Sequence, residues 1–373
     1  MIKKWITNIS LSIFSVLFIL GGCEVIFRIY DANRGLTIRD HQFQTSNSGY
    51  VKHPHIGIVH RVPWNWENDI IINHLGFRGA TPASIEKTDG AYRIICIGGS
   101  TTFGVVAEDE TYPVQLSNIL NDEVEGRTIE VINAGVSSYT TVESLINLEL
   151  RLLDYQPDMI VIYHAINDLR GNWIPNFKSD YTHYTKSWEY ETTSEYLAKF
   201  EDVGDSFLEE NSVFYWMVRN RLQNWVLSRI IDTTPDNYIT EPVREFKTAK
   251  PFKRNILNMI AIAKMHGIEV VLSSFALNLS KDWPDEKKQQ YLIDRPHYNM
   301  SPNSMDETVD GIVAHNTVIR EIAGATNVIF VDNGGIIPAD ESLFTDPMHP
   351  NAAGNALLAR NIADVIKKNG ISR

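Results

Sequence analysis

The chain has 373 residues, a net charge of −12 and a hydrophobic fraction of 43%. This length allows one large domain with insertions, and the composition is that of a globular protein and not of a disordered one. The acidic balance argues against nucleic acid as a partner, since phosphate binding requires a basic surface. The two cysteines, Cys23 and Cys96, lie in unlike contexts, so we expect no disulfide between them.

Residues 1–30 are predicted to form a membrane anchor. Lys3 and Lys4 precede a mostly apolar stretch that continues to Ile29 and is long enough to cross a bilayer. The two lysines favour a cytoplasmic N-terminus, which places the rest of the chain on the periplasmic side. Two alternatives stay open. The segment ending at Cys23 resembles a lipoprotein cleavage site, with Cys23 as the lipidated residue, and a buried helix of a soluble protein is the third interpretation.

Residues 31–91 are rich in Asn, His, Pro and Trp, and we expect an irregular, partly β accessory segment. In residues 92–373 the pattern changes to alternating strands and helices. Short apolar runs typical of buried strands occupy residues 93–97, 129–132, 159–163, 269–272 and 328–331. Apolar residues at helical spacing occupy residues 112–124, 142–153, 252–266, 306–323 and 351–368. The alternation predicts an α/β fold, a three-layer α/β/α domain around a five-stranded parallel sheet.

Two insertions interrupt this alternation, at about residues 170–250 and 276–305. The first is crowded with aromatic residues, which are equally consistent with an acyl or carbohydrate pocket and with helices packed over the core. His53, His55 and His60 suggest a metal site only weakly, and a solvated loop is the better interpretation. No spacing of cysteine and histidine predicts a structural zinc site.

The first candidate catalytic residue is Ser100. It follows a predicted strand and two glycines, Gly98 and Gly99, which permit a sharp turn at the carboxyl end of the strand. Such a turn exposes the hydroxyl where backbone amides can face a developing negative charge. A serine that caps a helix has the same local pattern, so Ser100 alone does not decide between the two.

The second candidate element is Asp346-Pro347-Met348-His349, directly before the last predicted helix. A carboxylate three residues before a histidine can reach the imidazole ring within one loop. Serine needs a base to become a nucleophile, and that base needs an acid to hold its tautomer. The motif therefore offers His349 as the base and Asp346 as its partner, with a simple helix cap as the local alternative.

Gly135 and Asn167 follow the second and third predicted strands and are candidate oxyanion donors. Gly135 can offer a backbone amide with no side chain in front of it, and Asn167 can offer its side-chain amide. Each residue taken alone is more often part of a turn. Together they favour a shared site, because each follows a successive predicted strand and parallel strands place such residues at one edge of the sheet.

Ser100, Gly135, Asn167 and His349 occur in the order that is typical of the four blocks of the SGNH/GDSL hydrolase family, and the sequence resembles that family over residues 93–366. The resemblance implies a flavodoxin-like fold and a serine-dependent ester hydrolase, with Asp346 as the acid of the catalytic triad. Ser100 would attack the ester while its own amide, the Gly135 amide and the Asn167 side chain hold the oxyanion. Water would then resolve the acyl-enzyme without a cofactor or metal.

Two positions depart from the family pattern. Gly99 stands where the family usually has aspartate, and Ala165 stands where it usually has glycine. Upstream, residues 73–79 resemble an element of membrane-anchored bacterial members. An α/β-hydrolase is the competing esterase fold, but its nucleophile motif requires glycine where Thr102 stands.

The expected substrate is a small-molecule or glycan ester, either a carboxylester or an O-acetyl ester. Two alternatives use the same residues differently. An O-acyltransferase would pass the acyl group to an extracytoplasmic polysaccharide, and a binding protein would keep the hydrolase scaffold without activity. The complete set of candidate residues argues against the binding protein. The sequence predicts no particular oligomeric state.

Overall fold

A computed structural model describes the chain in parts. The described residues are 2–32, 49–62, 64–66, 70–79, 84–183, 208, 211–215, 217–218, 221, 241–294, 301 and 304–370. The chain divides into two compact units. The smaller comprises Met1–Tyr50 and Ser187–Asp236, and the larger comprises Val51–Lys186 and Asn237–Arg373.

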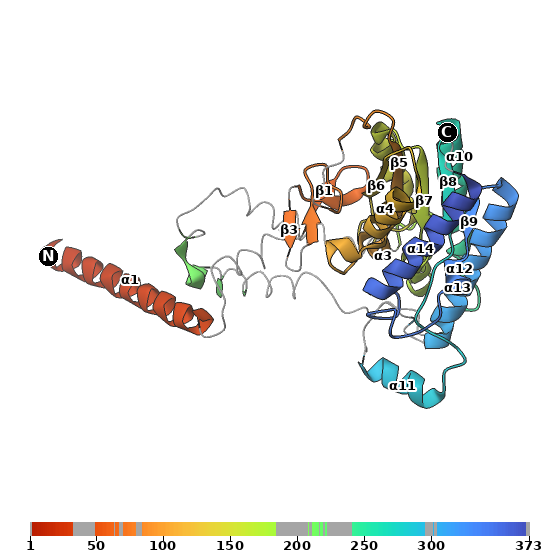
Figure 1. The fold of residues 1–373 in the computed structure, drawn as a ribbon. Helices are drawn as coiled ribbons and strands as arrows, with labels where there is room; N and C mark the ends of the chain where they lie inside the picture. The colour runs from red at the N-terminus through yellow and green to blue at the C-terminus, as the bar shows by residue number, and fades with distance from the viewer. Residues whose placement is uncertain are drawn as a thin grey trace. The chain divides into compact units, whose positions relative to one another are not determined.

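The larger unit is built on a five-stranded sheet whose neighbouring strands are all parallel (Figure 1). In spatial order the strands are β6 (Ile129–Asn133), β5 (Tyr92–Gly98), β7 (Met159–Tyr163), β8 (Glu269–Ser273) and β9 (Ile329–Val331). The first of these strands in the sequence thus lies between the second and the third, as in flavodoxin-like folds. The predicted five-stranded parallel sheet is confirmed.

Alternation along β5 explains the helical layers on both faces of the sheet. Ile94 and Cys96 belong to one hydrophobic cluster, and Ile95 and Ile97 belong to the other. The first cluster includes side chains of α4 (Tyr112–Glu123) and α14 (Ala352–Asn369), and the second includes side chains of α5 (Thr141–Leu150), α10 (Ala249–Met265) and α12 (Met305–Thr326). Because both faces of β5 are covered, its sequence is continuously apolar.

One predicted helix differs in extent from the observed element. The apolar spacing predicts a helix over residues 142–153, but α5 ends at Leu150. Arg151 has a non-helical backbone, with φ of −136°, and the chain continues as a 3-10 turn, η2 (Leu152–Tyr155). Leu152 remains fully buried in this turn, so the apolar spacing continues although the helix does not.

Short elements connect the layers. They are α3 (Ser100–Phe103), η1 (Glu108–Glu110), α6 (Ile166–Arg170), η3 (Gly171–Trp173), α11 (Asp285–Asp294) and α13 (Asn333–Ile336). The segment before β5 contains β1 (Tyr50–His53), β2 (Gly57–His60), β3 (Trp64–Trp66) and β4 (Ile70–Ile72), which pair as two small two-stranded sheets.

The segment after β4 packs on the edge of the main sheet. Arg78 forms an antiparallel bridge with Asn133 at the end of β6, and Phe77 packs edge-on against Tyr155. The Tyr139 hydroxyl donates to the Ile58 carbonyl at 2.5 Å. The contacts of Asn133 and Tyr139 brace the loop that follows β6, which is one of the loops at the carboxyl edge of the sheet.

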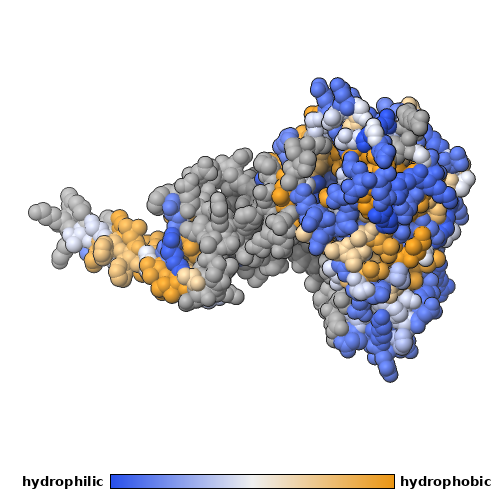
Figure 2. All heavy atoms as spheres, in the orientation of Figure 1, coloured by the Kyte–Doolittle hydropathy of each residue, from blue (hydrophilic) through white to orange (hydrophobic). Residues whose placement is uncertain are grey.

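The smaller unit contains α1 (Ile2–Ala32). Its segment Ser10–Tyr30 is long and apolar enough to cross a membrane, and none of that segment's most apolar window is buried. Figure 2 shows apolar side chains along this helix. The predicted apolar N-terminal helix is therefore present, although a signal sequence would have the same length and composition.

The described parts of the two predicted insertions are buried in different places. Trp173 and Tyr181 belong to the larger unit and are buried there, whereas Phe214 belongs to the smaller unit. The second insertion contributes α11, with Tyr291 in a small apolar cluster. The other aromatic residues of the first insertion lie mostly outside the described residues, so its role as a pocket lining stays a prediction.

Candidate active site

Ser100 lies at the turn between β5 and α3, where there is no room for side chains on the preceding two residues. A Cβ atom on Gly98 would lie 2.7 Å from the Tyr163 carbonyl oxygen, at the end of β7. A Cβ atom on Gly99 would lie 2.5 Å from Asn167 Nδ2. Both glycines are therefore required for close packing of the turn that carries Ser100 against β7 and the residues that follow it.

A chain of hydrogen bonds connects Ser100 with the loop before α14. Ser100 Oγ lies 2.8 Å from His349 Nε2, and His349 Nδ1 lies 2.6 Å from Asp346 Oδ2. His349 and Asp346 are both buried, with 4% and 8% of their surface exposed. This order of hydroxyl, imidazole and carboxylate is the arrangement that activates a serine for attack on a carbonyl group.

The backbone of the histidine loop is fixed by the same carboxylate. Asp346 Oδ1 accepts hydrogen bonds from the amides of Met348 and His349, each at 2.9 Å. The Asn278 amide, from the second insertion, donates to the Pro347 carbonyl at 2.8 Å. One oxygen of Asp346 thus holds the loop, and the other faces the imidazole ring.

The structure brings the two predicted oxyanion donors to the same turn. A Cβ atom on Gly135 would lie 2.3 Å from the Phe103 amide nitrogen, so the backbone of Gly135 lies directly against α3. Its own amide donates to Asn133 Oδ1 at 3.0 Å. Asn167 Nδ2 donates to the Tyr139 carbonyl at 2.9 Å. All five predicted site residues therefore surround one turn, while their catalytic roles stay predictions.

Asp168, the residue after Asn167, forms hydrogen bonds with two segments that are distant in the sequence. Asp168 accepts from the Thr141 amide and, at 2.5 Å, from the Thr141 hydroxyl, and it accepts from the Tyr181 hydroxyl at 3.0 Å. Burial raises the pKa of the Asp168 carboxyl to about 7, against the hydrogen bonds from Thr141 and Tyr181, which lower it. The sequence shows Asp168 beside a candidate donor, but its partners become visible only in three dimensions.

Other histidines near the sheet have structural partners. His164 Nε2 lies 2.8 Å from Ser144 Oγ, and burial lowers the pKa of His164 to about 3, which keeps it neutral. His60 Nδ1 lies 3.0 Å from the Gly76 carbonyl, and burial lowers its pKa to about 4. Within the described ranges, no group of three or more His, Cys, Asp or Glu side chains is placed to hold a metal ion.

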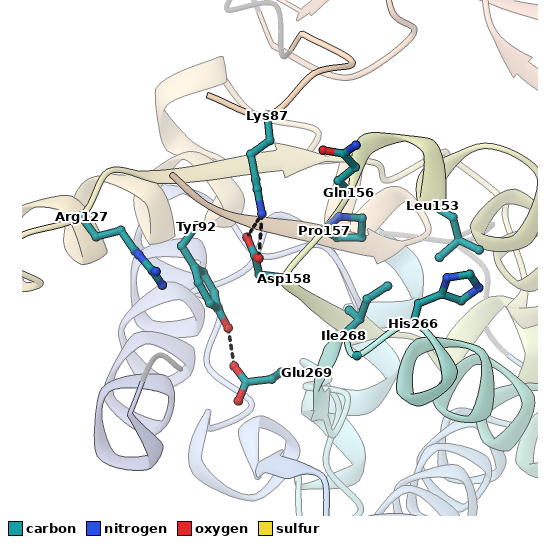
Figure 3. A pocket seen from close by; sticks show the side chains of 11 residues that line it. Lys87, Tyr92, Arg127, Leu153, Gln156, Pro157, Asp158, His266, Ile268 and Glu269 are labelled. Atoms are coloured by element: carbon teal, nitrogen blue, oxygen red, sulfur yellow. Dashed lines mark hydrogen bonds and ion pairs between the residues drawn. The ribbon is translucent and has the colours of Figure 1, made fainter. Parts of the chain in front are cut away.

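A depression of about 470 Å³ lies at the edge of the sheet opposite to the Ser100 turn (Figure 3). It is lined by residues at the amino ends of β5 and β8, far along each strand from the turn that carries Ser100. Its charged groups bind one another. Lys87 Nζ lies 2.8 Å from Asp158 Oδ1, and the Tyr92 hydroxyl donates to Glu269. These pairs hold the ends of the strands together, and the depression is not part of the candidate site.

Comparison with known proteins identifies the family. Residues 96–357 match the model of the GDSL-like Lipase/Acylhydrolase family. The chain belongs to this family. It is accordingly a hydrolase that acts on esters. None of the curated proteins matches the sequence significantly.

Solved structures similar to this GDSL-like hydrolase include two bacterial enzymes. An acetylxylan esterase from Geobacillus stearothermophilus has 15% sequence identity and a TM-score of 0.41, and the match covers 74% of this chain and 96% of that one. A GDSL-like lipase from Bacteroides thetaiotaomicron has 15% identity and a TM-score of 0.40, with 76% of this chain and 92% of that chain covered.

Gly99 provides a test of the packing around Ser100. In the variant Gly99→Ala, the new methyl group must displace the Asn167 amide, which is the end of a side chain and can move without unfolding the turn. We expect kcat/KM for an ester to fall about a hundredfold, as for the loss of one oxyanion donor. The melting temperature should change by no more than about 3 °C.

The control for this experiment is Gly324→Ala, because a Cβ atom at Gly324 would meet no atom within 4 Å. This control should keep wild-type activity. Full activity in Gly99→Ala, or loss of activity only together with unfolding, would contradict the expectation that residue 99 affects activity through the position of the Asn167 amide.

The raised pKa of Asp168 predicts that the free energy of unfolding depends on pH. Its pKa is raised from an ordinary 3.8 to about 7 in the folded protein, so the folded state holds a proton that the unfolded state releases. The stability from this group is present below pH 4 and is lost as pH rises to about 7. Relative to Asp168→Asn, wild type should lose about 2 kcal/mol of unfolding free energy between pH 5 and 7.

Thermal unfolding of both proteins in the same detergent, at pH 5, 6, 7 and 8, measures this difference. The variant also loses hydrogen-bond acceptors, which shifts its stability by a constant amount of about 1–3 kcal/mol. The trend with pH is therefore the informative quantity. A difference between the two proteins that stays constant from pH 5 to pH 8 would rule out titration of Asp168 in this range.

Proposed function

We propose that the protein is a serine-dependent carboxylesterase that works through an acyl-enzyme on Ser100. The observation that carries this proposal is the hydrogen-bonded chain from Ser100 Oγ through His349 to Asp346, with steps of 2.8 and 2.6 Å. Hydrolysis of esters is the activity of its family. The identity of the nucleophile, the base and the acid is the further step proposed here.

In the first half of the reaction, Ser100 Oγ attacks the carbonyl carbon of the ester while His349 Nε2 accepts the hydroxyl proton. Asp346 accepts a hydrogen bond from the Nδ1–H group of the imidazole, and so fixes the tautomer and stabilises the imidazolium. The tetrahedral intermediate expels the alcohol, which takes the proton from His349. In the second half, water attacks the acyl group on Ser100 while His349 Nε2 accepts a proton from the water. The acid is then released, and His349 returns the proton to Ser100 Oγ.

The oxyanion would be held by the amide of Ser100, the amide of Gly135 and the side chain of Asn167. The Asn167 amide carries two N–H groups, and only one is needed for the Tyr139 carbonyl. The Gly135 amide donates to Asn133 Oδ1, so its role requires that the N–H group be shared with the developing negative charge. Each such donor is worth about 2.7–4 kcal/mol in the transition state.

We further propose that α1 anchors the enzyme in the cytoplasmic membrane and that the catalytic unit acts on the periplasmic side. The apolar segment Ser10–Tyr30 supports the anchor, and the lysines at positions 3 and 4 support its orientation. In this location the enzyme would meet small-molecule esters and O-acetyl esters of surface glycans. The alternative form of attachment is a lipid carried by Cys23.

Replacement of the proposed nucleophile tests the mechanism. In Ser100→Ala the attacking oxygen is absent, so hydrolysis of p-nitrophenyl acetate should fall by at least about a thousandfold. Ser117→Ala, on α4 and outside the site, is the matched control and should keep wild-type activity. A phosphonate probe for serine hydrolases should label wild type on the peptide that contains Ser100. Undiminished turnover by Ser100→Ala would exclude this residue as the nucleophile.

The fate of the acyl group separates hydrolysis from transfer. With an acetyl donor, wild type should release acetate at the same rate in the presence and in the absence of a glycan acceptor, because water resolves the acyl-enzyme. The measurement is the ratio of free acetate to acetylated glycan. Formation of acetylated glycan faster than acetate would identify an O-acyltransferase instead, and loss of both products in Ser100→Ala would show that they share one intermediate.

A further inference from the structure

The apolar segment of α1 contains two charged residues. Glu24 and Arg28 are the only charged residues between Ser10 and Tyr30 in the sequence. They are one helical turn apart, and Arg28 Nε lies 2.7 Å from Glu24 Oε1. Ionisable residues within a membrane-spanning helix are costly unless they are paired, so their partners indicate what else enters the membrane region.

The additional partners of Glu24 come from the first insertion, almost 190 residues away in the sequence. Ser212 Oγ donates to Glu24 Oε2 at 2.8 Å, and the backbone amides of Val213 and Phe214 donate to the same carboxylate at 3.0 and 2.9 Å. Arg28 Nη2 donates to the Asn211 carbonyl at 2.6 Å. The carboxylate thus receives two backbone amides and a hydroxyl from one short stretch of the insertion.

Apolar contacts accompany these hydrogen bonds. The rings of Phe27 and Phe214 are stacked with centroids 5.8 Å apart, and Val213 is 3% exposed. Glu24 and Phe27 lie on neighbouring positions of the same helix face. The stretch from residue 211 to 215 therefore contacts α1 through one patch that is polar at its centre and apolar at its side.

We propose that residues 211–215 dock on α1 inside the outer part of the lipid bilayer, with Glu24 as the receptor for their backbone amides. This inference rests on the proposed membrane anchor. Glu24 precedes Tyr30 by six residues, or about 9 Å along the helix axis, which is within the outer half of a hydrocarbon core about 30 Å thick. The amides of Val213 and Phe214 must reach the same depth to bond the carboxylate.

The partner that fits the remaining surface is lipid. Leu17, Phe18 and Ile19 of α1 are 61–73% exposed, and Val218, which follows the docked stretch in the sequence, is 39% exposed. The two charges of the spanning segment are turned to the insertion, which leaves an outer surface without charge from Leu11 to Cys23. Such a surface is matched by hydrocarbon chains and not by water.

The proposed docking changes how the catalytic unit is attached to the membrane. The smaller unit is joined to the larger one at three points of the chain, after Tyr50, before Ser187 and after Asp236. A simple anchor would connect them once. With residues 211–215 held at the bilayer, the hydrolase is attached through three connections of the chain in place of one.

Cross-linking in vesicles tests the contact. The full chain, with Cys23→Ser to remove the neighbouring thiol, carries Phe27→Cys with Phe214→Cys and is reconstituted in phosphatidylcholine vesicles. A short bifunctional maleimide should join these two positions. Phe18→Cys with Phe214→Cys is the matched control and should remain unjoined, because Phe18 lies nine residues earlier on α1. Cys96 is fully buried in the core of the larger unit, so it stays in place.

The role of Glu24 is tested in the same background. Glu24→Leu removes both acceptor oxygens and should slow cross-linking about tenfold or more, whereas Glu24→Gln keeps one acceptor and should slow it less. A fluorophore on Val218→Cys, introduced as the single added cysteine in the Cys23→Ser chain, should be quenched by nitroxide-labelled lipid, and Glu24→Leu should reduce this quenching. A fluorophore on Phe14→Cys should be quenched in every variant, since it reports the anchor itself.

An alkaline carbonate wash separates the two possible failures. Release of the full chain from the vesicles would show that α1 is not an anchor, and the docking proposal would fall with it. Retention of the chain without cross-linking would overturn the docking alone. Equal cross-linking in Glu24→Leu and wild type, or a fluorophore at residue 218 that lipid nitroxides do not quench, would also overturn it while the anchor stands.

Discussion

Close packing of backbone against backbone at the carboxyl ends of β5, β6 and β7 is the constraint on which the candidate site depends. Gly98 approaches the Tyr163 carbonyl, and Gly135 approaches the Phe103 amide, at distances that exclude any side chain. The strand order places β5 between β6 and β7, so both neighbours press on the same turn. Ser100 occupies the first position after that turn, and its orientation is therefore set by its neighbours.

The same packing leaves little space for a side chain at position 99. In this chain the Asn167 amide occupies the space next to Gly99 and is held there by the Tyr139 carbonyl. A larger residue at position 99 would need that space. The departure from the usual family pattern is thus consistent with a site in which Asn167 lies directly against the turn that carries Ser100.

Local sequence patterns were sufficient to predict the strands of the sheet and most of the helices, since apolar periodicity reflects which face of each element is buried. The order of Ser100, Gly135, Asn167 and His349 was sufficient to select the candidate site, because parallel strands bring their carboxyl ends together. The end of α5 was not predictable in this way. Leu152 keeps the apolar spacing after the helix has ended at Leu150.

Contacts between polar groups that are distant in the chain also could not be predicted from the sequence. Nothing in the residues around Asp168 specifies Thr141 and Tyr181 as its partners, and nothing around Glu24 specifies Ser212. These pairings depend on where loops of different lengths cross in space. Periodicity records only burial along one element, so it carries no information on which loop supplies the donor.

Carboxylates in this protein hold irregular backbone segments by accepting hydrogen bonds from their amides. Asp168 does so with Thr141, and Asp346 does so with Met348 and His349. Amides that are satisfied in this way no longer need water, so the loops can be buried without unpaired polar groups. In Asp346 the arrangement has a second consequence. Because Oδ1 is committed to the backbone, Oδ2 has a single orientation relative to the imidazole of His349. The bonds that stabilise the loop are therefore also the bonds that direct the imidazole of His349 toward Ser100.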